Sequence, residues 1–556
     1  MRYLLFFLVI GSCSYDQNIN EADLILSSNN VILMTGTKQA QPLSIAMKDE
    51  IIIWIGSHKE AQHIQGKHID FGDQAVLPGF IDAHGHASYL AFATQVANIA
   101  SPPVGRINNI KELQTELGKF IKDSKLKPGE WVMGLGYDDS LLEEQRHPTK
   151  DDLDEVSTEH PIYLIHVSAH LGASNSLGLS LANINSKTQD PPGGKIRRYN
   201  SSTEPNGVFE ETAAYPLQQL AMSAYKDPIG SVKKAMNIYA KNGITTAQDG
   251  ASSPETIGLM QAADAQGMIN LDIISYPIGQ NGLDQNLDTI NFGNYEGRLK
   301  IGGIKLILDG SPQGKTAYLT EPYYKPPHSE SDSYKGYPLI PQSEVSKWVK
   351  HYSELNIPIM AHANGDAAAD MLIKAVNNAE IASDHRTIMI HAQTVREDQL
   401  DQMKELKIIP SYFSTHTFYW GDWHRDSVFG EDRAMRISPT KSTLNRKITF
   451  TVHNDAPVVP PDMIRLLWST TNRKTRSGKV LGEEQKISTY DALKAITINA
   501  AYQHFEDDIK GTIEVGKQAD LVVLSMDPLK IDTENLLEID VVATFSRGLE
   551  IFNAKK

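Results

Sequence analysis

The sequence predicts an α/β fold: a (β/α)8 TIM barrel, a small β-sandwich domain built from both chain ends, and a subdomain inserted after the first barrel strand. The main observation is a series of eight short apolar segments with helical stretches between them, a pattern typical of such barrels. The segments are 77–86, 243–248, 270–276, 302–308, 357–362, 387–391, 407–413 and 447–453. Two further observations are β-rich chain ends and a long interval between the first two segments.

Length and composition set the class of protein. At 556 residues the chain is too long for one ordinary domain. A hydrophobic content of 40% and a charged content of 22% are those of a folded globular protein. The net charge is -15, and no block of lysines and arginines stands out. This negative charge argues against nucleic acid as a partner and against electrostatic binding to anionic lipid.

The first residues have the layout of an export signal. Met1-Arg2 is basic, residues 3–10 are apolar, and Gly11-Ser12 are small, so residues 1–12 are predicted to be a signal peptide. Residues 10–13 resemble the bacterial lipobox, which predicts a lipid anchor on Cys13, the only cysteine. The protein is then expected to be exported and held at a bacterial membrane, on the periplasmic or cell-surface side. The alternative is an ordinary secretory signal with an incidental cysteine.

The two chain ends predict one small domain. Residues 13–22 are polar and read as a tether. Residues 23–78 and 501–556 both contain short β-branched runs separated by turn residues. Neither end has enough strands for a stable sandwich, so we expect the two to pair. Two independent small domains are the alternative. The barrel then occupies residues 79–500.

The interval of about 88–227 is too long for one strand-to-helix connection. It contains strand-like segments of its own at 131–137 and 162–167, and a turn-rich stretch at 190–194. We interpret it as a subdomain inserted into the barrel and able to cap a site at the barrel mouth. No other stretch of the chain approaches the roughly 20 apolar residues of a membrane-spanning helix.

Metal-ligand residues stand at the ends of five predicted strands, where barrel enzymes place their chemistry. His84 and His86 end the first strand, and their i, i+2 spacing on an extended backbone points both side chains the same way. The others are Lys305, His362, His391 and Asp455. Each histidine alone is equally well explained as a hydrogen-bonded strand end. Together the residues supply enough ligands for two divalent metals.

Lys305 is the unusual member of this set. A protonated lysine beside two cations is unfavourable, and burial near positive charge depresses a lysine pKa. The neutral amine reacts with carbon dioxide to give a carbamate, whose two oxygens can bridge metals about 3.5–4 Å apart. The alternative is an ion pair between Lys305 and Asp309 or a substrate carboxylate.

Four further residues are candidates for the substrate pocket. His416 and Trp420 belong to an aromatic stretch, 415–424, that would suit an apolar substituent; the alternative is an aromatic cluster that packs a loop. His170 ends a strand of the insertion and is expected to reach the pocket, with a structural role as the alternative. Asp309 follows the fourth strand. Glu210 and Glu211 are expected to be a solvated pair.

Several motifs resemble the amidohydrolase superfamily, in the branch of N-substituted formamide deformylases and exoenzyme-regulatory hydrolases (amidohydrolase family 3). The resemblance covers nearly all of the mature chain. The matching stretches are residues 78–86, Ile304-Lys305 with Asp309-Gly310, residues 362–366, residues 391–393, residues 454–457 and residues 511–520. Asn454 replaces the usual serine before the aspartate, and His453 adds an imidazole beside the site.

The resemblance implies a ligand set and a reaction. His84 and His86 would bind one metal, His362 and His391 a second, and N6-carboxylated Lys305 would bridge them. The metals would be one or two divalent ions, zinc first among them. Asp455 would be both a ligand and the general base for metal-activated hydroxide that attacks a non-peptide carbon–nitrogen bond, such as an N-acyl or N-formyl amide. The alternatives are a deaminase, an ester hydrolase or a phosphotriester hydrolase that uses the same site, or a lipid-anchored metal-dependent binding protein.

Overall fold

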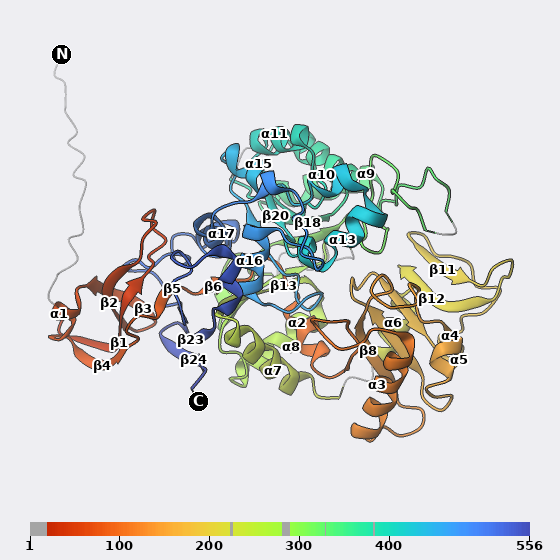
Figure 1. Cartoon of the computed structure of the whole chain (residues 1–556), viewed down its shortest axis with the longest axis horizontal. Helices are drawn as coiled ribbons and strands as arrows, with labels where there is room; N and C mark the ends of the chain where they lie inside the picture. The colour runs from red at the N-terminus through yellow and green to blue at the C-terminus, as the bar shows by residue number, and fades with distance from the viewer. Residues whose placement is uncertain (1–18, 223–225, 281–289, 328–329, 382–383, 556) are drawn as a thin grey trace, which may run out of the picture.

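The computed structural model describes residues 19–555, apart from 223–225, 281–289, 328–329 and 382–383. The chain has a mixed α/β fold in three parts (Figure 1): a sheet shared by both chain ends, a central α/β unit, and a separate sheet on the far side of that unit. The predicted signal peptide and Cys13 lie outside the described residues. Within the described part, no helix is long and apolar enough to cross a membrane.

Strands from both chain ends form one eight-stranded sheet in the order β24-β23-β22-β5-β1-β2-β3, with β4 also paired to β1. The strands are β1 (Glu21–Val31), β2 (Gln41–Lys48), β3 (Ile51–Gly56), β4 (Gln65–Asp70), β5 (Ala75–Pro78), β22 (Leu521–Leu524), β23 (Val541–Ser546) and β24 (Leu549–Asn553). Antiparallel pairing of β5 with β22 joins the two ends of the chain. Strand β1 is long enough to pair with β4 along its first half and β5 near its end, so hydrogen bonds link the strands of both chain ends into one sheet.

The central unit contains the eight predicted strands, divided between two five-stranded sheets. The first sheet has the order β15-β16-β14-β13-β6 and the second β17-β18-β19-β20-β21. Their bounds are β6 (Phe80–Ile81), β13 (Ile244–Ser252), β14 (Asp272–Pro277), β15 (Tyr295–Glu296), β16 (Leu299–Ile301), β17 (Ile304–Ile307), β18 (Ile359–Ala363), β19 (Ile388–His391), β20 (Ile409–Tyr412) and β21 (Thr451–Val452). All neighbours in these sheets except β15 and β16 are parallel.

The fourth predicted strand, 302–308, is observed as β17, and Gly302-Gly303 separate it from β16, which lies in the other sheet. Both glycines allow close approach: a side-chain carbon on Gly302 would lie 2.7 Å from Ile274, and one on Gly303 would lie 2.3 Å from the Pro358 carbonyl oxygen. A bridge between Lys305 and Ile278 still links the two sheets at this seam.

At the other seam, β21 and β6 form no ladder among the described residues. Two backbone hydrogen bonds connect the segments that follow these strands. The Asp455 N–H donates to the His84 carbonyl over 3.2 Å, and the His86 N–H donates to the Ala456 carbonyl over 2.8 Å. The loops that carry the predicted metal ligands are therefore tied directly to each other.

Helices cover the outside of the central sheets, with their apolar faces in one large core with the strands. They include α7 (Pro228–Lys241), α8 (Pro254–Ala265), α9 (Gln342–Glu354), α10 (Asp366–Ala379), α11 (Glu397–Glu405), α16 (Met463–Asn472) and α17 (Thr489–Ala495). Local sequence sets their starts: Ser253 forms a capping box before α8, and Asp227 caps α7, which begins with Pro228.

The segment between β6 and β13 folds into a six-stranded sheet of its own, in the order β11-β12-β10-β9-β8-β7. Its strands are β7 (Ala97–Asn98), β8 (Val132–Tyr137), β9 (Ile162–His166), β10 (Leu171–Ser174), β11 (Gly194–Arg198) and β12 (Pro205–Glu211), with helices α3 (Ile110–Asp123) and α6 (Tyr215–Met222) among those that flank it. Two apolar clusters separate from the main core stabilise this subdomain. The β9–β10 hairpin carries His170 at its turn.

Candidate metal centre

The predicted ligands converge at the carboxyl ends of the central strands, in a cavity of about 290 Å³. The Asp455 carboxylate lies among three imidazoles. Its Oδ1 is 3.0 Å from His86 Nε2 and 3.4 Å from His84 Nε2, and its Oδ2 is 3.9 Å from His391 Nε2. Lys305 Nζ is 3.2 Å from His84 Nε2. Chain segments up to 371 residues apart in sequence therefore supply one cluster of ligand atoms.

Hydrogen bonds from the neighbouring strand β13 fix where the protons sit on His84 and His86. Gln248 donates its amide N–H to the Ala83 carbonyl, so its Oε1 must be the acceptor for His84 Nδ1–H, 2.5 Å away. His86 Nδ1–H donates to the Gly250 carbonyl oxygen. Both imidazoles are therefore left with a lone pair on Nε2, and both lone pairs face the Asp455 carboxylate.

The second pair of histidines is held in a similar way. His362 Nδ1–H donates to Asp309 Oδ1 over 3.1 Å, which leaves the lone pair on Nε2, 3.3 Å from the Asn364 amide nitrogen. His391 Nδ1 is 3.2 Å from Nε2 of His453. The rings of His362 and His391 pack edge to face with their centroids 4.5 Å apart. Such outer partners orient imidazole ligands and keep them basic.

The residues present fit a bound divalent cation. Asp455 Oδ1 is buried and accepts no hydrogen bond from the described residues, although two Nε2 lone pairs lie within 3.4 Å of it. Acceptors that face one another at this distance repel unless a cation lies between them. Two imidazoles and one carboxylate are a suitable ligand set for zinc and related ions.

Burial sets the protonation states that metal ligands need. Burial, together with the nearby positive charges of Lys305 and neighbouring histidines, holds the pKa of His84 well below its usual range. Burial and the neighbouring histidines do the same for His391. Burial also lowers the pKa of Lys305 to about 7, against a smaller opposing effect of Asp455. The imidazoles of His84 and His391 are therefore neutral, and the lysine amine is available in its neutral form near pH 7.

Asp309, predicted for the substrate pocket, is not among the described residues that line the cavity. It is fully buried and accepts four hydrogen bonds: from His362 Nδ1–H and from the backbone N–H groups of Tyr318, Asn364 and Gly365. Lys305 is not among these donors, so the alternative of an ion pair between the two is wrong. The role of Asp309 is to hold His362 and the surrounding loops in place.

His416 and Trp420 do not line the cavity either, in the part of the chain that the structure describes. Both are buried and stacked on each other with centroids 4.6 Å apart. The Trp420 indole N–H needs an acceptor and donates to Asp138 over 2.6 Å, while His416 is hydrogen-bonded to His424 over 2.9 Å. The alternative of an aromatic cluster that packs a loop is the one observed.

His170 does reach the cavity, where its ring lies 5.3 Å from the ring of His362. Its Nδ1–H donates to Glu211 Oε2 over 2.8 Å. Glu211 is only 1% exposed, so the expectation of a solvated Glu210–Glu211 pair is wrong. Burial lowers the pKa of His170, but the carboxylates of Glu211, Asp309 and Asp455 together raise it by more, and the net pKa lies above the usual value. The role of Glu211 was missed because its partner is 41 residues away.

A second group of possible ligands, Asp138, Asp139 and His166, lies in the inserted subdomain. Hydrogen bonds already account for it. The Ser168 backbone N–H donates to His166 Nδ1, which leaves a proton on Nε2 to donate to Asp139 over 3.1 Å. Asp138 accepts from Trp420 and Ser140. These contacts are those of a structural network that joins the subdomain to the loop after β20.

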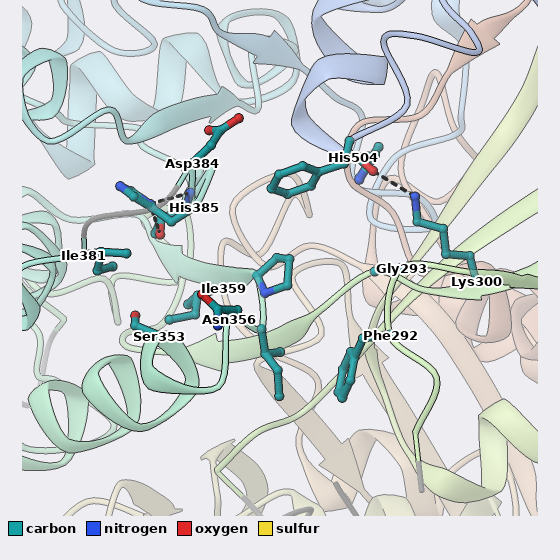
Figure 2. Close-up of a pocket in the computed structure, with 15 residues that line it drawn as sticks. Phe292, Gly293, Lys300, Ser353, Asn356, Ile359, Ile381, Asp384, His385 and His504 are labelled. Atoms are coloured by element: carbon teal, nitrogen blue, oxygen red, sulfur yellow. Dashed lines mark hydrogen bonds between the residues drawn. The ribbon is translucent and has the colours of Figure 1, made fainter. Parts of the chain in front are cut away.

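A second cavity, of about 280 Å³, lies at the opposite ends of the central strands (Figure 2). Ile359, the first residue of β18, lines it, whereas His362 near the other end of β18 lines the metal cavity. Two of its polar residues have hydrogen-bond partners: Lys300 donates to the His504 carbonyl, and His385 is hydrogen-bonded to Thr387. It contains none of the predicted ligands.

Comparison with known proteins finds a family profile, relatives in sequence and a solved structure that are similar to this chain. The profile of the amidohydrolase family matches residues 67–552. N-substituted formamide deformylase of Arthrobacter pascens is 28% identical over 495 residues, which cover 86% of this chain and 89% of that protein. A putative amidohydrolase of Bacillus subtilis (strain 168) is 23% identical over 92% of this chain and 96% of its own. The fold is similar to that of an uncharacterized metal-dependent hydrolase from Pyrococcus horikoshii OT3, with a TM-score of 0.72 and 22% identity over 92% of this chain and 99% of that one.

Proposed function

This chain belongs to the amidohydrolase family, and from that premise we propose that it hydrolyses a non-peptide carbon–nitrogen bond in an N-acyl or N-formyl amide. The similarity to N-substituted formamide deformylase supports the bond type. The lining of the cavity supports an apolar substituent, because Tyr89, Tyr215, Met222 and Val458 form its walls beside the ligands.

One observation carries the proposal more than any other: Asp455 Oδ1 is buried without a hydrogen bond between the lone pairs of His84 and His86. A binding site for a neutral molecule has no use for this arrangement. The residues that would hold metal are His84, His86, Lys305 as its carbamate, His362, His391 and Asp455. Bound metal would lower the pKa of a water molecule towards 7 and polarise a carbonyl group.

The remaining steps belong to the protein's own side chains. Asp455 accepts the proton of the attacking water on a carboxylate oxygen and then delivers it to the departing nitrogen. The carbon–nitrogen bond breaks as that nitrogen receives the proton, and the products are a carboxylic acid and an amine. Gln248 and Gly250 hold the imidazoles of His84 and His86 in place while the carboxylate changes its protonation state.

A second part of the proposal concerns the architecture of the central unit. We infer that the two parallel sheets function as a single (β/α)8 barrel, closed at one seam by the continuous chain of β16 and β17 and at the other by the loop contacts of His84 and His86. The strand order and the position of all ligands at one end of the strands support this reading.

Substitution of the proposed base tests the mechanism. Asp455→Asn keeps the shape of the side chain but removes its ability to take a proton, so kcat should fall by at least about 100-fold. Metal content and amide turnover should be measured on the same preparation. Asp422→Asn, a matched change at a carboxylate bonded to Ser477 away from the cavity, should retain activity. An Asp455→Asn protein that still turns over amides would contradict the assignment of the base.

We also propose that the mature protein is lipid-anchored through Cys13 after removal of residues 1–12, and exported to the outside of a bacterial cytoplasmic membrane. The basic, apolar and small residues before Cys13 support this proposal. Metabolic labelling with a radioactive fatty acid should mark the wild type but not Cys13→Ala, and label on both proteins would refute the anchor at this residue.

A further inference from the structure

We propose that the inserted subdomain completes the active site: His170 contacts the reacting carbonyl of the substrate, and Glu211 is the positioning residue that holds it there. This inference rests on the proposed hydrolysis of an amide and adds to it a substrate-contacting group from outside the central α/β unit. Four features of the structure carry it.

The first feature is how the hairpin delivers His170. The turn between β9 and β10 places Ala169 in the left-handed region, with φ 60°. The His170 backbone N–H donates to Ser168 Oγ over 3.2 Å. These contacts aim the imidazole away from its own sheet and into the cavity, against the ring of His362. The side chain is 19% exposed, and this exposure faces the cavity that holds the ligands.

The second feature is the orientation of the imidazole. Its Nδ1–H is committed to Glu211 Oε2 at 2.8 Å. The Glu211 backbone N–H also donates to the His170 carbonyl over 2.7 Å, so backbone and side chain both tie the two residues together. The buried Glu211 carboxylate against Nδ1 favours the imidazolium form of His170, in which Nε2 also carries a proton and can donate to the carbonyl oxygen of a substrate. A carboxylate on the far nitrogen is a recurrent way to hold a functional imidazole.

The third feature is the unfavourable burial and backbone conformation of Glu211. Its side chain is 1% exposed, and its Oε1 is buried with no hydrogen-bond donor from the described residues. Its backbone is left-handed, with φ 50°. An unsatisfied buried carboxylate oxygen and a left-handed non-glycine residue are both energetically unfavourable. Strain of this kind is retained where function needs the geometry.

The fourth feature is the contact between the subdomain and the ligand loops. A side-chain carbon on Gly310 would lie 2.4 Å from Glu211 Oε1, so Glu211 packs directly on the backbone of the loop after β17. Asp309, the neighbour of Gly310, holds His362 through its carboxylate. The dyad of His170 and Glu211 is thus placed relative to the metal ligands by direct packing, with little freedom to drift.

A purely structural role would be to fasten the subdomain to the central unit. Such a role predicts a loss of stability without a specific effect on turnover. A substrate contact predicts instead a fall in kcat, because a hydrogen bond to the carbonyl oxygen strengthens as negative charge develops there. The two roles are therefore separable by kinetics on folded, metal-loaded protein.

The experiment uses the metal-loaded full chain and four variants: His170→Gln, Glu211→Gln, the double variant, and Glu210→Gln as the control. Glu210 is the adjacent residue, but its carboxylate accepts from Arg197 at 2.6 Å and does not line the cavity. Rates are measured on the N-formyl or N-acyl amide that the wild type cleaves fastest. Melting temperature and metal content are measured on the same samples.

His170→Gln should lower kcat by about 100-fold while KM changes less than about threefold, the size of effect expected for one donor to a developing oxyanion. Glu211→Gln should lower kcat by about tenfold. The double variant should be no slower than His170→Gln, because Glu211 acts through His170. Glu210→Gln should keep the wild-type kcat. Wild-type kcat in His170→Gln would overturn the inference while leaving the amide hydrolase proposal intact.

Binding of acetate, a small carboxylate that resembles the acid product, gives a second readout that needs no turnover. Calorimetry should show about tenfold weaker acetate binding to His170→Gln than to the wild type, with Glu210→Gln unchanged. If the wild type cleaves no amide, the proposed function fails, and acetate binding still decides the inference. Equal acetate affinity in wild type and His170→Gln would then overturn it.

Discussion

At the scale of single residues, the positions of two protons determine the character of the site. Gln248 and the Gly250 carbonyl both accept hydrogen bonds from the Nδ1–H groups of His84 and His86. The Nε2 lone pairs therefore point at Asp455, which is also an acceptor. Three acceptors that face one another define a place for a cation. The result follows from which nitrogen carries the proton, and a list of ligand types alone would not give it.

Sequence reasoning could predict that the candidate ligands lie close together, because they follow a local rule: each lies in, ends or follows an apolar strand. It could not identify Glu211 or the true role of Asp309, because both act through side-chain hydrogen bonds to residues more than 40 positions away. It also misjudged Trp420, whose indole N–H finds Asp138 in the inserted subdomain, 282 residues away. Pairings of this kind depend on the tertiary fold.

Lys305 gives a prediction about pH. Its pKa is lowered to about 7 by burial, so the ammonium form dominates below pH 7 and the neutral amine above it. Only the neutral amine attacks carbon dioxide, forming the carbamate and releasing one proton. With ¹³C-labelled carbon dioxide held at constant concentration, the carbamate resonance in ¹³C NMR should therefore grow as the pH rises from about 6 to about 8.

Two variants assign that resonance. Lys305→Arg should abolish it, because a guanidinium stays protonated throughout this range. Lys300→Arg is a matched control at a second buried lysine, which is paired with Glu506 at 2.9 Å on the opposite side of the central unit. It should leave the resonance unchanged. A resonance that persists in Lys305→Arg would show that the carbamate forms elsewhere or that Lys305 is not carboxylated.

At the scale of elements, the ends of β17 and β18 are tied together by one carboxylate. Asp309 follows β17 and bonds to the side chain of His362 on β18, as well as to the backbone of residues 318, 364 and 365. A strand end that presents a metal ligand needs such a partner, because a free loop would let the imidazole rotate away from the metal.

Asp309→Asn should weaken this arrangement. The amide NH₂ group of the asparagine would replace one of the two acceptor oxygens and would face the N–H groups that now donate to it. This change should lower the free energy of unfolding by about 1–3 kcal/mol. Misplacement of His362 should lower metal affinity by about 10–100-fold. Competition against a chelator measures the affinity, and thermal unfolding measures the stability.

Asp366→Asn provides the comparison. Asp366 is the first residue of α10, after β18, and accepts from the Thr320 N–H over 2.9 Å, but it forms no hydrogen bond to a predicted ligand. The Asp366→Asn protein should be less stable than the wild type but should bind metal with the same affinity. If Asp309→Asn and Asp366→Asn have the same metal affinity as the wild type, the orienting role of Asp309 is wrong.

At the scale of the whole molecule, two of the three units, the central unit and the inserted subdomain, line the metal cavity. The order of these units along the chain could be predicted from periodicity and from the long interval after the first strand. The seam at Gly302-Gly303 could not be predicted from the sequence, because an apolar run does not show that Ile274 and the Pro358 carbonyl lie close to the backbone there. The pairing of the chain ends was expected, but the partners of β1 could not be predicted, because nothing in the local pattern shows that β1 pairs with β2, β4 and β5.

The most direct test of the central claim is to measure bound metal and amide hydrolysis on one preparation, before and after the metal is stripped and returned. The account predicts that stripped protein is inactive, and that hydrolysis of N-formyl or N-acyl amides returns in proportion to divalent metal bound, up to one or two ions per chain. Full activity in the stripped protein would contradict the account. So would metal-loaded protein that cleaves only esters or phosphotriesters, or that binds amides without cleaving them.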